Sequence, residues 1–100
     1  KASHFAIVGV AARLNVTNKV CSYASIAITG AGAKPVKAKK SEEILTGTKI
    51  KESDITAAAN ESINGLDFLD DIHASSEYRE HLTKTFVSRA LSEISAGISI

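Results

Sequence analysis

The sequence predicts an α+β domain in which a three-stranded, or alternatively four-stranded, antiparallel sheet carries three helices on one face. Two apolar runs, 5–14 and 20–29, come first in the chain and have the composition of β-strands. Helical spacing of apolar residues appears only later, over 54–63 and again after Ser75. Strands first and helices afterwards favour an antiparallel meander over alternating strand and helix units.

Length and composition indicate one small domain. The 100 residues leave no room for separate cofactor and substrate domains, and 44% hydrophobic with 23% charged residues is typical of a globular protein. The net charge of +1 gives no bulk attraction to nucleic acid or to anionic membranes, and the apolar runs are too short to span a bilayer. We therefore expect a cytoplasmic protein. Because the chain begins at Lys1 and enters a strand almost at once, we expect residues 1–100 to be a fragment of a longer subunit.

The first two strands are expected to pair as a hairpin, because the turn-forming segment 15–19 separates them. In the second strand one parity is apolar apart from Ser22 and should meet the helices, and it holds Val20, Ala24, Ile26 and Ile28. The opposite parity is smaller and more polar, and it holds Cys21, Tyr23, Ser25, Ala27 and Thr29. With residues of the first strand, the open face holds Phe5, Ile7, Ala11, Tyr23 and Ala27. We expect another domain or subunit to cover that face; the alternative is that small residues are tolerated in water there.

A glycine turn at Gly30 and Gly32 leads into a short third strand over 34–38, which Pro35 confines to a sheet edge. This turn lacks the spacing of a phosphate-binding loop and of a dinucleotide fingerprint. Ser41 is the expected N-cap of a short helix that stops at Gly47.

Two further helices follow. Ser53 is the expected cap of a helix over 54–63, and the segment 66–74 reads as an irregular link. Ser75 should cap the last helix, with Gly97 as its stop. The predicted apolar side of that helix holds Tyr78, Leu82, Phe86, Ala90, Leu91 and Ile94, and the predicted wet side holds Arg79, Glu80, Lys84, Ser88 and Glu93.

No catalytic constellation is visible. Cys21 reads as a small strand residue rather than a nucleophile, and the basic cluster Lys34, Lys37, Lys39 and Lys40 reads as a solvated strand edge. Glu77 and His81 share a helix face and could hold a metal with Asp70, Asp71 or His73, but such pairs are a common accident. His4 could carry a proton, although no partner is evident.

Three blocks carry a family resemblance: FAIVGVAARL at 5–14, ITGAGAKPVKA with EEILTG over 28–47, and DDIHASSEYR at 70–79 followed by Arg89-Ala90-Leu91. In this order they resemble the C-terminal domain of the medium, FAD-binding subunit of carbon monoxide dehydrogenase and its relatives among the molybdenum hydroxylases, which include xanthine dehydrogenase. The resemblance covers nearly the whole chain.

The resemblance implies an oxidoreductase complex with a large molybdenum–molybdopterin subunit, a small subunit with two [2Fe-2S] clusters and this medium subunit. Substrate would be oxidised at molybdenum, and electrons would pass through the clusters and FAD to an external acceptor. The preceding domains would hold most of the FAD, so the isolated domain is expected to be inactive.

The resemblance also implies contact with the flavin edge through the segment entering the first strand. The matching positions are Lys1 and His4, followed by Phe5 and Ala6; His4 stands where the family has an acidic residue. His73 stands where arginine is usual, in a motif that we interpret as helix entry and packing. The alternative function is a stand-alone protein-interaction module with no redox role.

Overall fold

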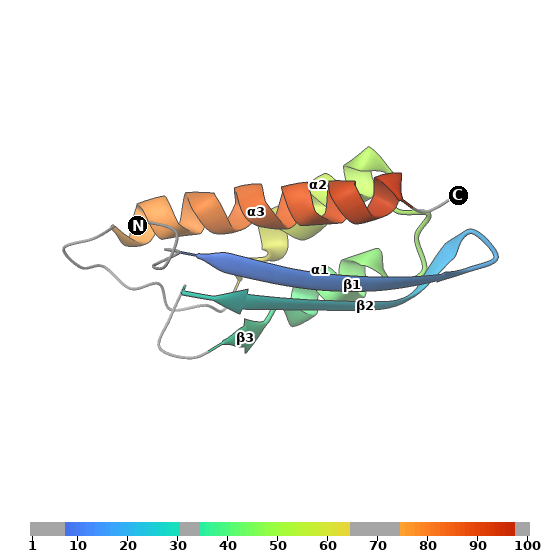
Figure 1. The fold of residues 1–100 in the computed structure, drawn as a ribbon, viewed down its shortest axis with the longest axis horizontal. Coiled ribbons are helices and arrows are strands. Elements are labelled where there is room, and N and C mark those ends of the chain that lie inside the picture. The colour runs from blue at the N-terminus through green and yellow to red at the C-terminus, as the bar shows by residue number, and fades with distance from the viewer. Residues whose placement is uncertain (1–7, 31–34, 65–74, 98–100) are drawn as a thin grey trace.

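The computed structural model describes residues 8–30, 35–64 and 75–97. Its elements, in chain order, are β1 (Gly9–Thr17), β2 (Val20–Thr29), β3 (Val36–Lys37), α1 (Lys39–Leu45), α2 (Glu52–Glu61) and α3 (Ser76–Ala96). The strands form one antiparallel sheet in the order β1-β2-β3. In Figure 1, α3 extends along the length of the β1–β2 hairpin. The predicted α+β class, with a three-stranded sheet and three helices, is confirmed.

The hairpin is longer and its turn tighter than expected. β1 continues to Thr17, so only Asn18 and Lys19 form the turn, with φ of 54° and 66°. Two successive residues with positive φ match the twist of a two-residue hairpin connection, and asparagine is among the residues that adopt this conformation most readily. The predicted turn over 15–19 was therefore too wide.

A β-bulge changes the face assignment at the start of β2. Asn15 pairs with Tyr23 and Val16 pairs with Cys21, so Ser22 is the extra residue. Because side chains alternate along a strand, one inserted residue reverses the parity that precedes it. Cys21 is consequently buried on the helix side, contrary to the prediction, while Ser22 and Tyr23 are both exposed.

The core lies between the sheet and the helices. Ala24, Ile26 and Ile28 of β2 are buried as predicted, and so are Val8 and Leu14 of the first strand run. α3 packs against β1, α1 packs against β2, and α2 packs against both other helices. The helices contribute the buried side chains of Leu45, Ile55, Ala58, Ala59, Val87 and Leu91.

The opposite face of the sheet carries small and polar side chains. Ala11 is exposed, Ala27 is half-buried, and Tyr23 is 47% exposed. Phe5 and Ile7 lie outside the described residues. The cover expected over this face stays a prediction.

β3 and α1 differ from the expectation at the helix start. β3 follows Pro35 and lies at the edge of the sheet, as predicted. α1 begins at Lys39, with Ala38 at the N-cap position, so Ser41 is not the cap. Ser41 is instead fully buried, and its hydroxyl donates to the carbonyl of Ala58 in α2 at 2.5 Å. Ser41 therefore holds α1 against α2 and does not cap a helix.

α2 begins two residues earlier than expected. Lys51 occupies the N-cap position, and its backbone N–H donates to Asp54 Oδ2 at 2.9 Å. The predicted cap, Ser53, lies inside the first turn and is exposed. The helix start is therefore stabilised by the Asp54 carboxylate, which accepts from the N–H of the N-cap residue, and not by a serine hydroxyl.

α3 is bounded as predicted but faces a different way. Ser75 Oγ accepts from the Tyr78 N–H at 3.1 Å, and Gly97 closes the helix through bonds to Glu93 and Ile94. The buried stripe runs at four-residue steps through Arg79, Thr83, Val87 and Leu91, while Leu82, Phe86 and Ile94 pack at its side. Arg79, predicted to face water, is 5% exposed, and Tyr78 is 50% exposed. The buried Arg79 agrees with a packing role for its motif.

Candidate functional site

The two residues predicted to contact a cofactor, Lys1 and His4, lie outside the described residues. The described chain begins at Val8, directly before β1. Beside this point a small hollow of about 240 Å³ opens between the start of β1 and α3. It is lined by Val8, Gly9, Val10, Phe86, Arg89, Ala90 and Glu93.

This first hollow combines an apolar floor with a charged rim. The guanidinium of Arg89 lies 5.8 Å from the centroid of the Phe86 ring, a cation–π distance. Gly9 allows the close approach of β2 here, because a Cβ at this position would come within 2.7 Å of Thr29 Oγ1. The volume of this first hollow, about 240 Å³, is below the usual range of small-molecule sites. Its lining residues can therefore form one wall of a site, but they do not enclose a dinucleotide.

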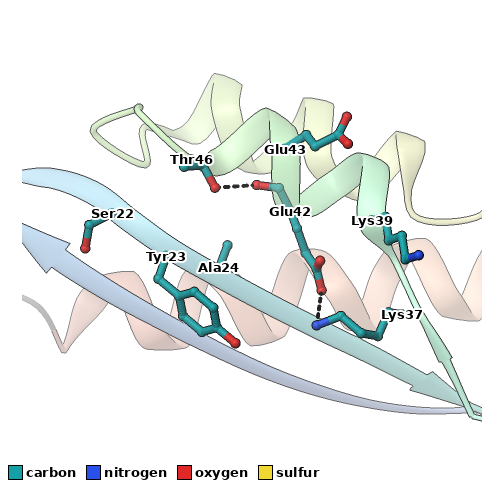
Figure 2. Close-up of a pocket in the computed structure, with 8 residues that line it drawn as sticks. All are labelled: Ser22, Tyr23, Ala24, Lys37, Lys39, Glu42, Glu43 and Thr46. Carbon is teal, nitrogen blue, oxygen red and sulfur yellow. Dashed lines mark hydrogen bonds and ion pairs between the residues drawn. The ribbon is translucent and has the colours of Figure 1, made fainter.

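A second, larger hollow lies on the β3 side of β2. Beside it, the Glu42 side chain bonds to the edge of β2 beyond the end of β3. Glu42 Oε2 accepts from the backbone N–H of Ile26 at 2.8 Å and lies 3.3 Å from Lys37 Nζ. Lys37 also donates to Ser25 Oγ at 3.3 Å. Figure 2 shows the Glu42 side chain reaching down from α1 to this edge. No local pattern in the sequence indicates a hydrogen bond between Glu42 and residue 26, because the two residues are 16 positions apart.

The hollow beside Glu42 measures about 660 Å³ and is open to solvent. It is lined by Ser22, Tyr23, Ala24, Lys37, Lys39, Glu42, Glu43 and Thr46 (Figure 2). Three of the lysines predicted as a basic cluster, Lys37, Lys39 and Lys40, are exposed near this edge, as a solvated strand edge requires. Lys34 lies outside the described residues.

Neither metal nor thiol chemistry finds support in the described residues. Glu77 and His81 are exposed on α3, and within the described ranges no three His, Cys, Asp or Glu side chains gather to hold a metal ion. Asp70, Asp71 and His73 lie outside those ranges. Burial raises the pKa of the Cys21 thiol, whose Sγ lies 3.4 Å from the carbonyl oxygen of Tyr23, so Cys21 is not an activated nucleophile.

The described helices also include none with the length and apolar character needed to cross a bilayer. The described residues therefore form an α+β domain whose surface carries shallow, open hollows. Residues 1–94 match the family described as the CO dehydrogenase flavoprotein C-terminal domain. The chain belongs to this family.

Two relatives from Paenarthrobacter nicotinovorans support the assignment. The chain is 34% identical over 73 residues to the alpha subunit of the 6-hydroxypseudooxynicotine dehydrogenase complex, covering 73% of this chain and 25% of the relative. It is 27% identical over 96 residues to the medium subunit of nicotine 6-hydroxylase, covering 96% and 34%. The chain thus spans between a quarter and about a third of the length of these relatives.

Solved structures show the same fold. Quinoline 2-oxidoreductase from Pseudomonas putida 86 superposes with a TM-score of 0.87 at 30% identity, over 93% of this chain and 33% of that chain. CO dehydrogenase from Oligotropha carboxidovorans gives a TM-score of 0.83 at 23% identity, over 92% and 32%. The family resemblance read from the sequence is confirmed by the family match over residues 1–94.

Proposed function

We propose that this chain is the C-terminal domain of the FAD-binding medium subunit of a molybdenum hydroxylase, and that it lies beside the flavin without binding it alone. The observation that carries the proposal is the family match over residues 1–94. The TM-score of 0.87 to an oxidoreductase of which this chain covers 33% supports it further.

The two hollows described above are open, which agrees with a domain that forms one wall of a cofactor site and does not enclose the cofactor. The smaller one lies where the leading segment enters β1, next to Lys1 and His4 in the sequence. We assign these two side chains to the flavin edge. Bound FAD would supply the redox step that carries electrons from the iron–sulfur clusters to an external acceptor.

The proposed partners are the FAD-binding domains of the same subunit, a large molybdopterin subunit and a small subunit with two [2Fe-2S] clusters. The proposed location is the cytoplasm. Relatives and structural neighbours are named for nicotine, quinoline and carbon monoxide. One domain type shared by enzymes of such different substrates agrees with substrate oxidation on another chain.

Flavin content tests the proposal. The isolated chain and a full-length medium subunit carrying it are each incubated with FAD, freed of unbound flavin and measured by absorbance. We expect flavin to remain only with the full-length subunit, and neither preparation alone to oxidise substrate. Stoichiometric flavin on the isolated chain would contradict the proposal.

The second candidate is a stand-alone interaction module. The open outer face of the sheet, where Tyr23 is 47% exposed, favours it. A coding sequence that ends at these residues, together with the absence of flavin from any longer product, would select this alternative.

A further inference from the structure

Ala24 holds a backbone donor and acceptor that the sheet does not use. It pairs with Leu14 across the hairpin, two positions from the pair Ile26 and Ala12. Ile26 turns its N–H to Glu42 and its carbonyl to Ala38, away from β1. Because hydrogen-bonded and non-hydrogen-bonded pairs alternate in an antiparallel ladder, Ala24 turns its N–H and carbonyl to the same edge.

The positions on either side of Ala24 along this edge are already satisfied. At one side Ala38 and Glu42 bond Ile26 at 2.9 and 2.8 Å. At the other, the backbone of 47–48 takes both groups of Cys21, at 2.7 and 2.8 Å. Across 8–30, 35–64 and 75–97, no hydrogen bond completes the outward N–H and carbonyl of Ala24. The edge therefore has a gap one residue wide.

The surroundings of this gap suit a neutral group. Ala24 is only 7% exposed, yet its edge faces the hollow of about 660 Å³. The rim carries Lys37 and Lys39 against Glu42 and Glu43, so the charges balance and favour no ion. A polar group that is largely buried is normally paired.

We infer that this gap receives the carboxamide of an asparagine or glutamine. A carboxamide offers an acceptor oxygen for the Ala24 N–H and an N–H donor for the Ala24 carbonyl, side by side. An added β-strand is disfavoured, because it would have to continue past Ile26 and Cys21, whose edge groups are occupied. A single side chain that approaches Ala24 alone does not need the edge groups of Ile26 or Cys21.

The asparagine or glutamine belongs to the remainder of the same medium subunit, and in this respect the inference rests on the proposed function. Two neutral hydrogen bonds at an open hollow give little affinity for a free partner, whereas a segment of the same polypeptide is present at high effective concentration. About two thirds of one matched relative and three quarters of the other lie outside the region that this chain covers, so such a segment is available.

A crystal structure of the full-length medium subunit carrying this sequence tests the inference. We expect a carboxamide of that subunit with its oxygen and nitrogen each about 3 Å from the Ala24 N and O. Water at both positions, a paired strand or a residue of another subunit would overturn it. Flavin retained in the same crystals would show that the proposed function stands even if the carboxamide is missing.

Amide exchange in solution supplies a second test. Replacing the contacting asparagine or glutamine by leucine should speed exchange of the Ala24 amide about tenfold, with Ile26 as an unaffected internal reference. Ala24→Pro removes the same N–H without breaking a bond to β1. Ala12→Pro is the control, since the Ala12 N–H faces the opposite sheet edge. In a double variant, Ala24→Pro and the leucine change remove the same contact, so together they should lower Tm no more than either change alone. Ala12→Pro removes a different N–H, so its loss of Tm should add to that of the leucine change. Unchanged exchange or full additivity for Ala24→Pro would refute the contact.

Discussion

Glu42 and Ile26 are joined by a hydrogen bond that takes the place of a bond to a longer β3. The carboxylate of Glu42 in α1 lies 2.8 Å from the backbone nitrogen of Ile26 in β2, at the position where β3 has ended. Because an unpaired backbone N–H inside a protein is costly, this side chain both completes the sheet edge and fixes α1 over β2. The two-residue length of β3 is tolerated for this reason.

Replacing Glu42 by alanine should lower the free energy of unfolding by about 1–3 kcal/mol, because the Ile26 N–H loses its acceptor. Glu42→Gln keeps an acceptor oxygen and loses only the ion pair to Lys37, whose side chain is 51% exposed. Such exposed pairs contribute about 0–1 kcal/mol. Urea unfolding of the three proteins measures the difference.

Glu43→Ala is the matched control, because Glu43 is exposed on the same helix and, within the described part of the chain, no hydrogen bond or ion pair joins it to β2. We expect this change to stay within about 0.5 kcal/mol of the unmodified protein. Equal losses for Glu42→Ala and Glu43→Ala would show that helix propensity or the dipole, rather than the bond to Ile26, explains the effect.

Ser41 provides a second test of how the helices are held. Its buried hydroxyl donates to the Ala58 carbonyl, and the Ser62 N–H, the usual partner of that carbonyl, bonds Ala59 instead. Ser41→Ala should therefore cost about 1–2 kcal/mol by leaving the carbonyl unpaired. Thermal unfolding beside Ser53→Ala, an exposed serine on α2, gives the comparison. A larger loss of stability for Ser53→Ala than for Ser41→Ala would contradict this and would support Ser53 as a helix cap, as the sequence predicted.

The order and type of the elements could be predicted because they depend on local patterns. Apolar alternation marked β2, helical spacing marked α2 and α3, and Ser75 was a correct cap. The side assignment of Cys21 could not be predicted, because it depends on a bulge opposite Asn15 and Val16. The interruption at Ser22 was the visible trace of that bulge.

The misplaced residues have a common cause. Ser41 and Ser53 looked like caps because serine favours helix starts, but α1 begins before Ser41 and α2 uses Asp54. Arg79 looked solvent-facing because it is charged, whereas the register of α3 places it with Thr83 and Val87. The candidate edge site at Ala24 and Glu42 joins segments 16 or more residues apart, which periodicity cannot detect.

We expect Cys21 to make the free energy of unfolding sensitive to alkaline pH. Burial raises the pKa of its thiol in the folded protein, so the folded state holds its proton to higher pH than the unfolded chain does. The contribution of this group is complete below the ordinary thiol pKa and is lost as pH rises past about 9. The loss should approach at most about 1.4 kcal/mol per pH unit.

Urea unfolding at several pH values, with Cys21→Ala as the control, measures this loss. The unmodified protein should lose stability relative to Cys21→Ala as pH rises, and the thiol should react with a disulfide reagent far more slowly in the folded state than in urea. Parallel pH profiles, or equally fast labelling in both states, would show that the thiol is open to water.

His4 is the position where the flavin proposal can be tested by charge. In a full-length medium subunit, His4→Asp introduces a negative charge and restores the acidic residue implied by the family resemblance. If the side chain lies at the flavin edge, the charge disfavours the more negative reduced flavin, and the FAD midpoint potential should fall by tens of millivolts, on the order expected for one charge at such a distance. Spectroelectrochemical titration of the bound flavin gives this value.

Asn18→Asp is the matched control, since it adds the same charge at the hairpin tip. β1 separates the tip from the leading segment by nine residues, about 30 Å of extended chain. Over this distance a surface charge is screened, so the control should leave the potential unchanged. Equal shifts in the two variants would mean that His4 acts only through net charge, and no shift at His4 would remove it from the flavin edge. A shift confined to His4→Asp would leave this side chain as the contact through which the domain tunes the flavin.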